Sequence, residues 1–123
     1  MPITLQEERF ISAGATRMVA VAYDRWLDGS ELLTGTPTVV EVSYWTTDPD
    51  TETASTDLTL ANKAVNAAAL TINDRTVAIG KAVQFSVAVP STKAGYNYRV
   101  RVTGTTNGSP AQLEPIDVIL RVV

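Results

Sequence analysis

The most constraining feature of this 123-residue chain is a pair of strict alternations between Val83 and Gly104. Apolar residues take every second position in residues 83–89 and again in residues 96–102, and a turn-like segment separates the two runs. Successive side chains of a strand point to opposite faces, so each run buries one face and exposes the other. The pattern therefore predicts two strands of a layered β structure. The predicted core residues are Val83, Phe85, Val87, Tyr98, Val100 and Val102.

Further strand signals run along the rest of the chain. The additional predicted strands are residues 16–23, 38–45, 57–60, 68–72, 76–79 and 116–123. Asn107-Gly108 is a strong hairpin signal, and the alanine-rich residues 61–69 allow a single helical turn. Turn signals about every 8–12 residues are typical of an immunoglobulin-like sandwich. The predicted fold is all-β, a single immunoglobulin-like β-sandwich of about 7–9 antiparallel strands. It is expected to span residues 16–123, after an N-terminal arm or edge strand in residues 1–15.

The segment 38–45 carries a more detailed expectation about faces. Its alternation places Val40 and Tyr44 on one face, which we expect to be buried. Val39 and Trp45 lie on the other face together with polar residues, which predicts a wetter surface. A tryptophan on such a face is expected to be covered by a partner subunit.

Composition narrows the classes of function. The chain has neither histidine nor cysteine, so the common catalytic triads, thiol nucleophiles and thiolate metal sites are excluded. A formal net charge of −3 argues against non-specific binding of nucleic acid. We find no apolar run near the length of a membrane span and no signal-peptide pattern, so we expect no membrane association. The absence of cysteine fits synthesis in a reducing cytosol. We therefore expect no enzyme activity and no cofactor.

An acidic segment offers the one candidate metal site. Asp48, Asp50 and Glu52 alternate in a loop, and calcium favours several oxygen ligands. The loop lacks the glycine and the terminal bidentate acid of a calcium loop. A solvated acidic loop is the preferred interpretation, so no metal is expected.

Two sets of residues are candidates for contact with other proteins. The segment Ile3–Ile11 is predicted to be an arm or an edge strand, and edge strands invite pairing with other chains. Arg99 and Arg101 point outward from one strand, and with Arg121 they form a basic stripe if their strands pair. This stripe either meets acids of a neighbouring chain or is simply solvated. The candidate protein-contact residues are Ile3, Leu5, Phe10, Trp45, Arg99 and Arg101.

The aromatic residues leave an alternative open. Trp26, Trp45, Tyr23 and Tyr44 would form a sugar-binding platform if their rings were exposed together. Aromatic side chains in a small β domain more often belong to the core, with Trp26 closing one end of the sandwich.

Two stretches carry a resemblance to a known family. Residues 95–108 read Gly-Tyr-Asn-Tyr-Arg-Val-Arg-Val-Thr-Gly-Thr-Thr-Asn-Gly, and residues 19–35 combine a strand with Asp-Arg-Trp-Leu-Asp-Gly-Ser-Glu-Leu-Leu-Thr-Gly. Both resemble small immunoglobulin-like domains of tailed bacteriophage virion proteins, in particular the fibre–tail adaptor group and its relatives. The resemblance covers most of residues 16–108.

This resemblance implies a non-enzymatic structural subunit of a phage particle, present in many copies. It implies an adaptor or connector at the neck or tail that attaches fibres, located in the virion. The implied partners are copies of itself and neighbouring portal, neck, tail or fibre proteins. A capsid decoration protein with the same fold and a carbohydrate-binding or adhesin module are the alternatives.

Overall fold

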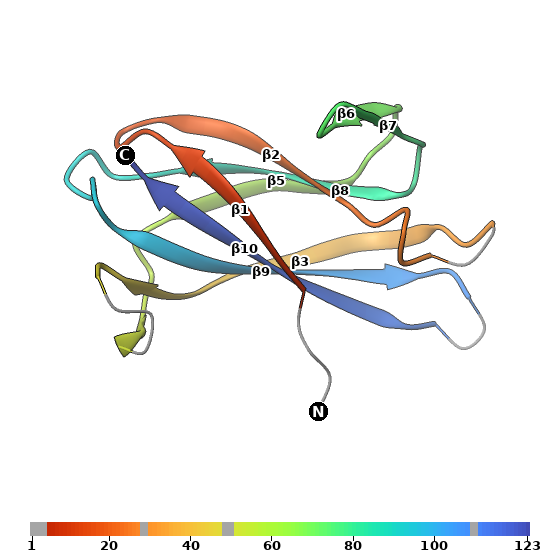
Figure 1. Ribbon diagram of the computed structural model, residues 1–123. Helices are drawn as coiled ribbons and strands as arrows, with labels where there is room; N and C mark the ends of the chain where they lie inside the picture. The colour runs from red at the N-terminus through yellow and green to blue at the C-terminus, as the bar shows by residue number, and fades with distance from the viewer. Residues whose placement is uncertain (1–4, 28–29, 48–50, 109–110) are drawn as a thin grey trace.

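The computed structural model describes residues 5–27, 30–47, 51–108 and 111–123, which form strands and no α-helix (Figure 1). The strands are β1 Leu5–Ile11, β2 Thr16–Ala22, β3 Leu33–Trp45, β4 Thr53–Ala54, β5 Thr59–Val65, β6 Leu70–Ile72, β7 Arg75–Val77, β8 Ala82–Ala88, β9 Asn97–Thr106 and β10 Leu113–Val122. The all-β prediction is confirmed. Within the described ranges there is no helix of the length and apolarity needed to cross a membrane.

The strands form two facing layers and a small hairpin (Figure 1). One layer is a five-stranded sheet in the order β1-β10-β9-β3-β4, and the other is a three-stranded sheet in the order β2-β8-β5. The hairpin of β6 and β7 packs at one end of the three-stranded sheet, where Ile72 and Val77 join Ala22 and Ala82 in a small apolar cluster. The main core lies between the two larger sheets.

The first and last strands lie side by side. β1 pairs with β10 in parallel, from Leu5 opposite Ile116 to Ile11 opposite Val122. The prediction of uniformly antiparallel strands is therefore wrong at this edge. Parallel neighbours need a long connection, and here the whole chain between residues 11 and 113 provides it. The segment 5–11 is an edge strand of the five-stranded sheet.

The core agrees with the two alternations. The predicted core residues Val83, Phe85, Val87, Tyr98, Val100 and Val102 are all fully buried. Strand β8 supplies one row from the three-stranded sheet and β9 supplies the facing row from the five-stranded sheet. Alternate positions of β9 therefore point to the outside of the molecule, where they include Arg99 and Arg101.

Strand β3 changes faces in its middle. The register against β9 shifts between Glu41 and Ser43, which marks a β-bulge. Before the bulge, Val39 lies in the core and Val40 is 49% exposed, so the prediction for these two residues is wrong. After the bulge, Tyr44 packs against the core as predicted. One extra residue reverses the alternation, which a strict period of two does not allow for.

Residues 61–69 form no helical turn. Thr59–Val65 is strand β5, which pairs with β8, so sheet pairing overrides the helix propensity of alanine. The buried side chain of Asn66 holds the next turn, because its Oδ1 accepts from the backbone N–H of Ala82 at 2.9 Å. Its Nδ2 donates to the carbonyl of Ala78 at 2.9 Å, which ties the β6–β7 hairpin to the sandwich.

Candidate interaction surface

The outer face of the five-stranded sheet carries most of the residues singled out from the sequence. Arg99 of β9 lies opposite Ser43 of β3 on one side and Ile119 of β10 on the other. Arg101 lies opposite Asp117 of β10. We call this surface, with Arg121 and Trp45 included, the outer face.

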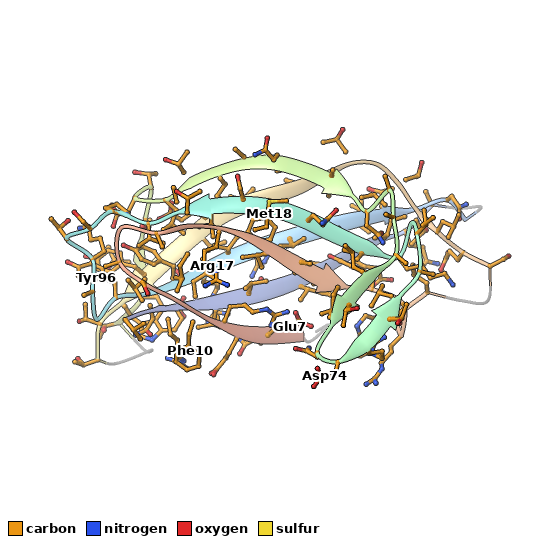
Figure 2. All side chains as sticks on the ribbon, turned by 90° about the horizontal axis from the view of Figure 1, so that it is seen from above. Glu7, Phe10, Arg17, Met18, Asp74 and Tyr96 are labelled. Carbon is orange, nitrogen blue, oxygen red and sulfur yellow. The ribbon has the colours of Figure 1, made fainter. Side chains whose placement is uncertain are left out.

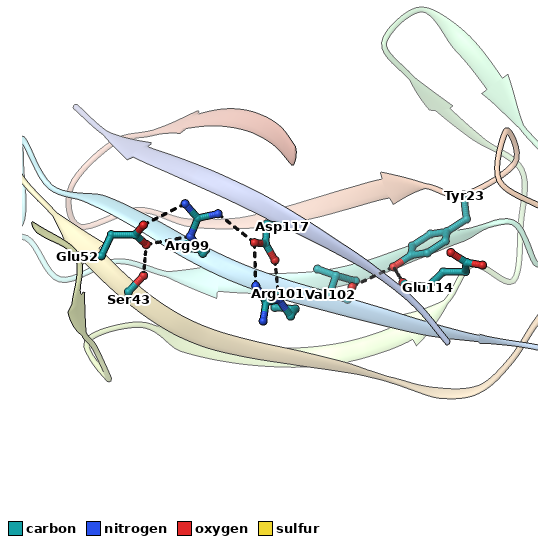
Figure 3. A network of polar contacts seen from close by, with 8 residues as sticks. All are labelled: Tyr23, Ser43, Glu52, Arg99, Arg101, Val102, Glu114 and Asp117. Atoms are coloured by element: carbon teal, nitrogen blue, oxygen red, sulfur yellow. Dashed lines mark hydrogen bonds and ion pairs between the residues drawn. The ribbon is translucent and has the colours of Figure 1, made fainter. Parts of the chain in front are cut away.

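An ion network centred on Asp117 links three strands of this face (Figure 3). Asp117 is 1% exposed, and its carboxylate accepts from Arg101 Nε at 2.8 Å and from Arg99 Nη1 at 3.0 Å. Arg99 also donates to Glu52 through Nε at 2.9 Å and Nη2 at 3.2 Å, a two-point contact. Glu52 in turn accepts from the hydroxyl of Ser43. The network joins β3 and the segment before β4 to β9 and β10.

The network favours the charged form of its acids. Burial acts to raise the pKa of Asp117, but the hydrogen bonds from Arg101 and Arg99 outweigh it and hold that pKa below its ordinary value. The hydrogen bond from Arg99 likewise lowers the pKa of Glu52. The same bonds raise the pKa of Arg99 and of Arg101, so all four groups stay ionised near neutral pH.

The arginines of the predicted basic stripe share one face, but acidic side chains beside them offset their positive charge. Arg99, Arg101 and Arg121 do lie on one face, as expected from strand pairing. Arg121 donates to Glu8 at 2.7 Å, so each arginine has an acidic partner within this chain. Asp117 is the residue that the sequence reasoning missed. A single acid inside the apolar run 116–120 is the signal that would have found it.

Trp45 is covered by its own chain. The prediction of a solvent-facing ring that awaits a partner is wrong, because the side chain is 6% exposed. The Arg99 guanidinium lies over the ring, 5.6 Å from its centroid, which is a cation–π contact. The ring is on the outer face as the alternation implied, but the long arginine side chain closes over it.

The four aromatic residues considered as a sugar platform are dispersed. Tyr23 is fully buried, and its hydroxyl lies 2.8 Å from the Glu114 carbonyl and 3.1 Å from the Val102 carbonyl (Figure 3). Tyr44 stacks on Tyr96 at the opposite side of the core, with ring centroids 5.3 Å apart. Trp26 is 49% exposed, so it does not close the end of the sandwich as expected.

The remaining predicted contact and acidic residues divide by position. Phe10 is 68% exposed on edge strand β1. Ile3, Asp48 and Asp50 lie outside the described residues, as does the side chain of Leu5. Within the described ranges, histidine, cysteine, aspartate and glutamate form no group of three that could hold a metal ion.

Comparisons with known proteins add little to this geometry. No protein-family model matches the chain, and no curated protein matches its sequence. Among solved structures it is similar to a nucleoside hydrolase-related hypothetical protein from Saccharophagus degradans associated with carbohydrate metabolism, with 15% identity and a TM-score of 0.49 over 98% of this chain and 22% of that one. It is also similar to a family 123 glycoside hydrolase from Clostridium perfringens, with 10% identity and a TM-score of 0.42 over 97% of this chain and 23% of that one. The chain thus spans less than a quarter of either protein.

Proposed function

We propose that this protein is a non-enzymatic structural subunit of a tailed bacteriophage particle, with an immunoglobulin-like fold. In this role it is an adaptor or connector at the neck or tail that works through contacts with copies of itself and with portal, tail or fibre proteins. Such a subunit resides in the virion. This role is suggested first by the resemblance of residues 19–35 and 95–108 to fibre–tail adaptor proteins.

The strand order supports the immunoglobulin-like assignment. In that fold, strands A, B, E and D form one sheet, and strands C, F and G form the core of the other. Here β2, β8 and β5 take the places of B, E and D, and β3, β9 and β10 take those of C, F and G, whereas the first strand, β1, pairs with β10 in the second sheet. Strand β4 extends the second sheet beside β3, as strand C′ does in variable-type domains.

The structural role is supported best by what the acidic side chains do: they accept hydrogen bonds that hold segments of this chain together. The carboxylate of Glu41 accepts from the backbone N–H groups of Asp57 and Leu58 at 2.9 and 2.8 Å, which holds the connection to β5. Asp57 accepts from the Tyr98 hydroxyl at 3.0 Å, and Asp117 secures the outer face. Acids committed to holding strands together favour a rigid building block over an acid–base catalyst.

A capsid decoration protein and a carbohydrate-binding module remain alternatives. One observation favours glycan binding: a groove of about 390 Å³ on the outer face, lined by Trp45 together with the polar side chains of Gln6, Glu8 and Asn97. Against it, the Trp45 ring lies beneath Arg99 and offers no free face for stacking. Binding to a glycan array that is lost in Gln6→Ala or Asn97→Ala would favour this alternative over the structural role.

The structural role is tested on purified particles. Mass spectrometry of phage particles isolated by density gradient is expected to find this chain at a fixed copy number. A knockout of its gene is expected to release tails without fibres, or heads without tails, and a plasmid copy should restore infectious particles. Particles that lack the chain and remain fully infectious would contradict the proposal. Normal tails with less stable capsids would instead indicate decoration.

A further inference from the structure

A groove runs along the open side of the sandwich, between edge strands β1 and β2. Its volume is about 240 Å³, and its floor is formed by Ile11, Val19 and Leu120. These three side chains are buried members of the main core. The groove is thus an opening onto the core at an edge where the two sheets are not joined. Its volume is below the roughly 300 Å³ of the smallest usual ligand pockets and suits a single protein side chain better.

The backbone of β2 faces this groove without a partner strand among the described residues. In the described part of the chain, β2 pairs only with β8 and is an edge strand. The N–H of Tyr23 bonds to Lys81, and the carbonyl of Ala15 bonds to Val89, so odd-numbered residues direct their backbone toward β8. Even-numbered residues then direct theirs to the open side, because antiparallel strands alternate in this way.

One contact within the chain confirms the direction of these groups. Arg9 of β1 donates to the carbonyl of Ala20 at 3.1 Å, across the groove. The backbone groups of Met18 lie two residues earlier on the same edge. An inward-pointing charge such as Arg9 also protects an edge from indiscriminate pairing, so the accessible part of the edge is short.

The side chains around this edge select the chemistry of an occupant. Arg17 shares the inward-facing row of β2 with Val19, yet it is exposed and forms no ion pair with any described residue. Arg9 is paired with Glu7 at 3.0 Å, so the mouth of the groove carries one uncompensated positive charge. Phe10 and Met18, which are 68% and 57% exposed, flank it on the outer sides of their strands (Figure 2).

We propose that the edge of β2 at Thr16–Ala20 takes up an extended acidic segment of another protein as an additional strand. Main-chain hydrogen bonds to Met18 supply affinity. On the inward row of the segment, a carboxylate lies beside Arg17 and an apolar side chain lies over Ile11, Val19 and Leu120. The inference rests on the proposed structural role, because it names the surface through which such a subunit is attached.

The test uses a heptapeptide, acetyl-Thr-Glu-Thr-Val-Thr-Glu-Thr-amide, which reads the same in both directions. Titration into the isotope-labelled full chain, followed by NMR, is expected to shift the amides of Met18 and Ala20 most. Two control peptides are expected to bind more weakly. One has lysine in place of both glutamates, and the other has the same residues in an order that no longer alternates. Shifts confined to the outer face, or no shifts at all, would overturn the inference.

Three variants separate the parts of the argument. Arg17→Glu is expected to weaken binding about fivefold and to favour the lysine peptide, since a partly exposed ion pair is worth up to about 1 kcal/mol. Arg25→Glu makes the same charge change at an exposed loop position and is expected to bind like wild type. Met18→Pro removes an N–H on the open side without taking a bond from β8, so folding should persist while binding is lost.

Two further outcomes decide the matter. Equal affinity of wild type and Arg17→Glu for the glutamate peptide would overturn the acidic specificity. Concentration-dependent dimers that disappear in Met18→Pro would show that the occupant is a second copy and would overturn the choice of another protein. Failure of the peptide test leaves particle incorporation intact, whereas failure of the particle experiment leaves peptide binding measurable.

Discussion

At the scale of single residues, Asp117 has the largest consequence for the outer face. It is buried among the apolar side chains of β10, and both Arg99 and Arg101 are oriented by it. A buried carboxylate is tolerated when partners satisfy its oxygens, and here both oxygens accept hydrogen bonds. The position of Arg99 over Trp45 follows from this arrangement.

Replacing Asp117 by asparagine should destabilise the protein. The side chain keeps its size but loses the charge that pairs with two arginines, so we expect a loss of about 2 kcal/mol in the free energy of unfolding. Urea denaturation near neutral pH measures it. Glu114→Gln makes the same chemical change on the same strand, away from the ion network, and should alter stability by less than about 0.5 kcal/mol. Equal effects of the two variants would contradict the role given to Asp117.

The lowered pKa of Asp117 also predicts a dependence on pH. Its folded pKa lies below the ordinary value of 3.8, so on acidification the unfolded state takes up the proton first. The stabilisation is present above about pH 4 and is lost as the pH falls through the folded pKa. The free energy of unfolding should therefore fall more steeply below about pH 4 in wild type than in Asp117→Asn. Parallel pH profiles for the two proteins would exclude this contribution.

Tyr23 is a second residue with a measurable role. Tyr23→Phe removes a buried hydroxyl that lies within hydrogen-bond distance of the carbonyls of Val102 and Glu114, so a buried polar contact between the two sheets is lost. We expect a loss of about 1–2 kcal/mol in thermal or urea unfolding. Tyr96→Phe, at a half-buried ring that stacks on Tyr44, should lose less. A larger loss of stability in Tyr23→Phe than in Tyr96→Phe is the result that checks the role given to the Tyr23 hydroxyl.

At the scale of elements, β1 is part of the folded unit. It pairs with β10 over seven positions, and Ile11 belongs to the main core. Removal of residues 1–11 should lower stability by at least about 3 kcal/mol, because it opens the core and exposes the edge of β10. Circular dichroism melting is compared for two shortened chains: 12–123, which lacks β1, and 5–123, which lacks only the residues before β1. A 12–123 chain that melts with the full chain would contradict this expectation.

Elements also show where prediction from sequence succeeds. The alternation of β8 and β9 is unbroken, and every core residue predicted from it is buried. Strand β3 has the same kind of alternation, but its bulge reverses the faces between Val40 and Tyr44. The sequence of β3 contains no glycine or proline at the bulge to mark it, so a fixed period assigns half of the strand to the wrong face.

At the scale of the whole molecule, the outer face depends on contacts between distant segments. Arg99 bonds to Glu52 and Asp117, which are 47 and 18 residues away along the chain. Sequence patterns predicted that the arginines point outward, because that depends only on their own strand. They did not predict that Glu52 and Asp117, from two other segments, pair with Arg99 and Arg101. They also did not predict that Arg99 covers Trp45. These features depend on the register between strands, which the alternation alone does not determine.

The parallel pairing of β1 and β10 has a mechanical consequence. The beginning of β1 and the end of β10 lie at opposite ends of their shared ladder. A load applied to the two ends of the chain therefore slides the strands past each other, and their hydrogen bonds must break together.

Single-molecule pulling from the termini is expected to need a higher force than pulling between residue 123 and a Thr92→Cys handle. The second geometry opens the antiparallel β9–β10 pair one bond at a time. The chain has no other cysteine, so the handle is unique. Equal forces would rule out the shear geometry. A fold built in this way resists tension applied to the two ends of its chain.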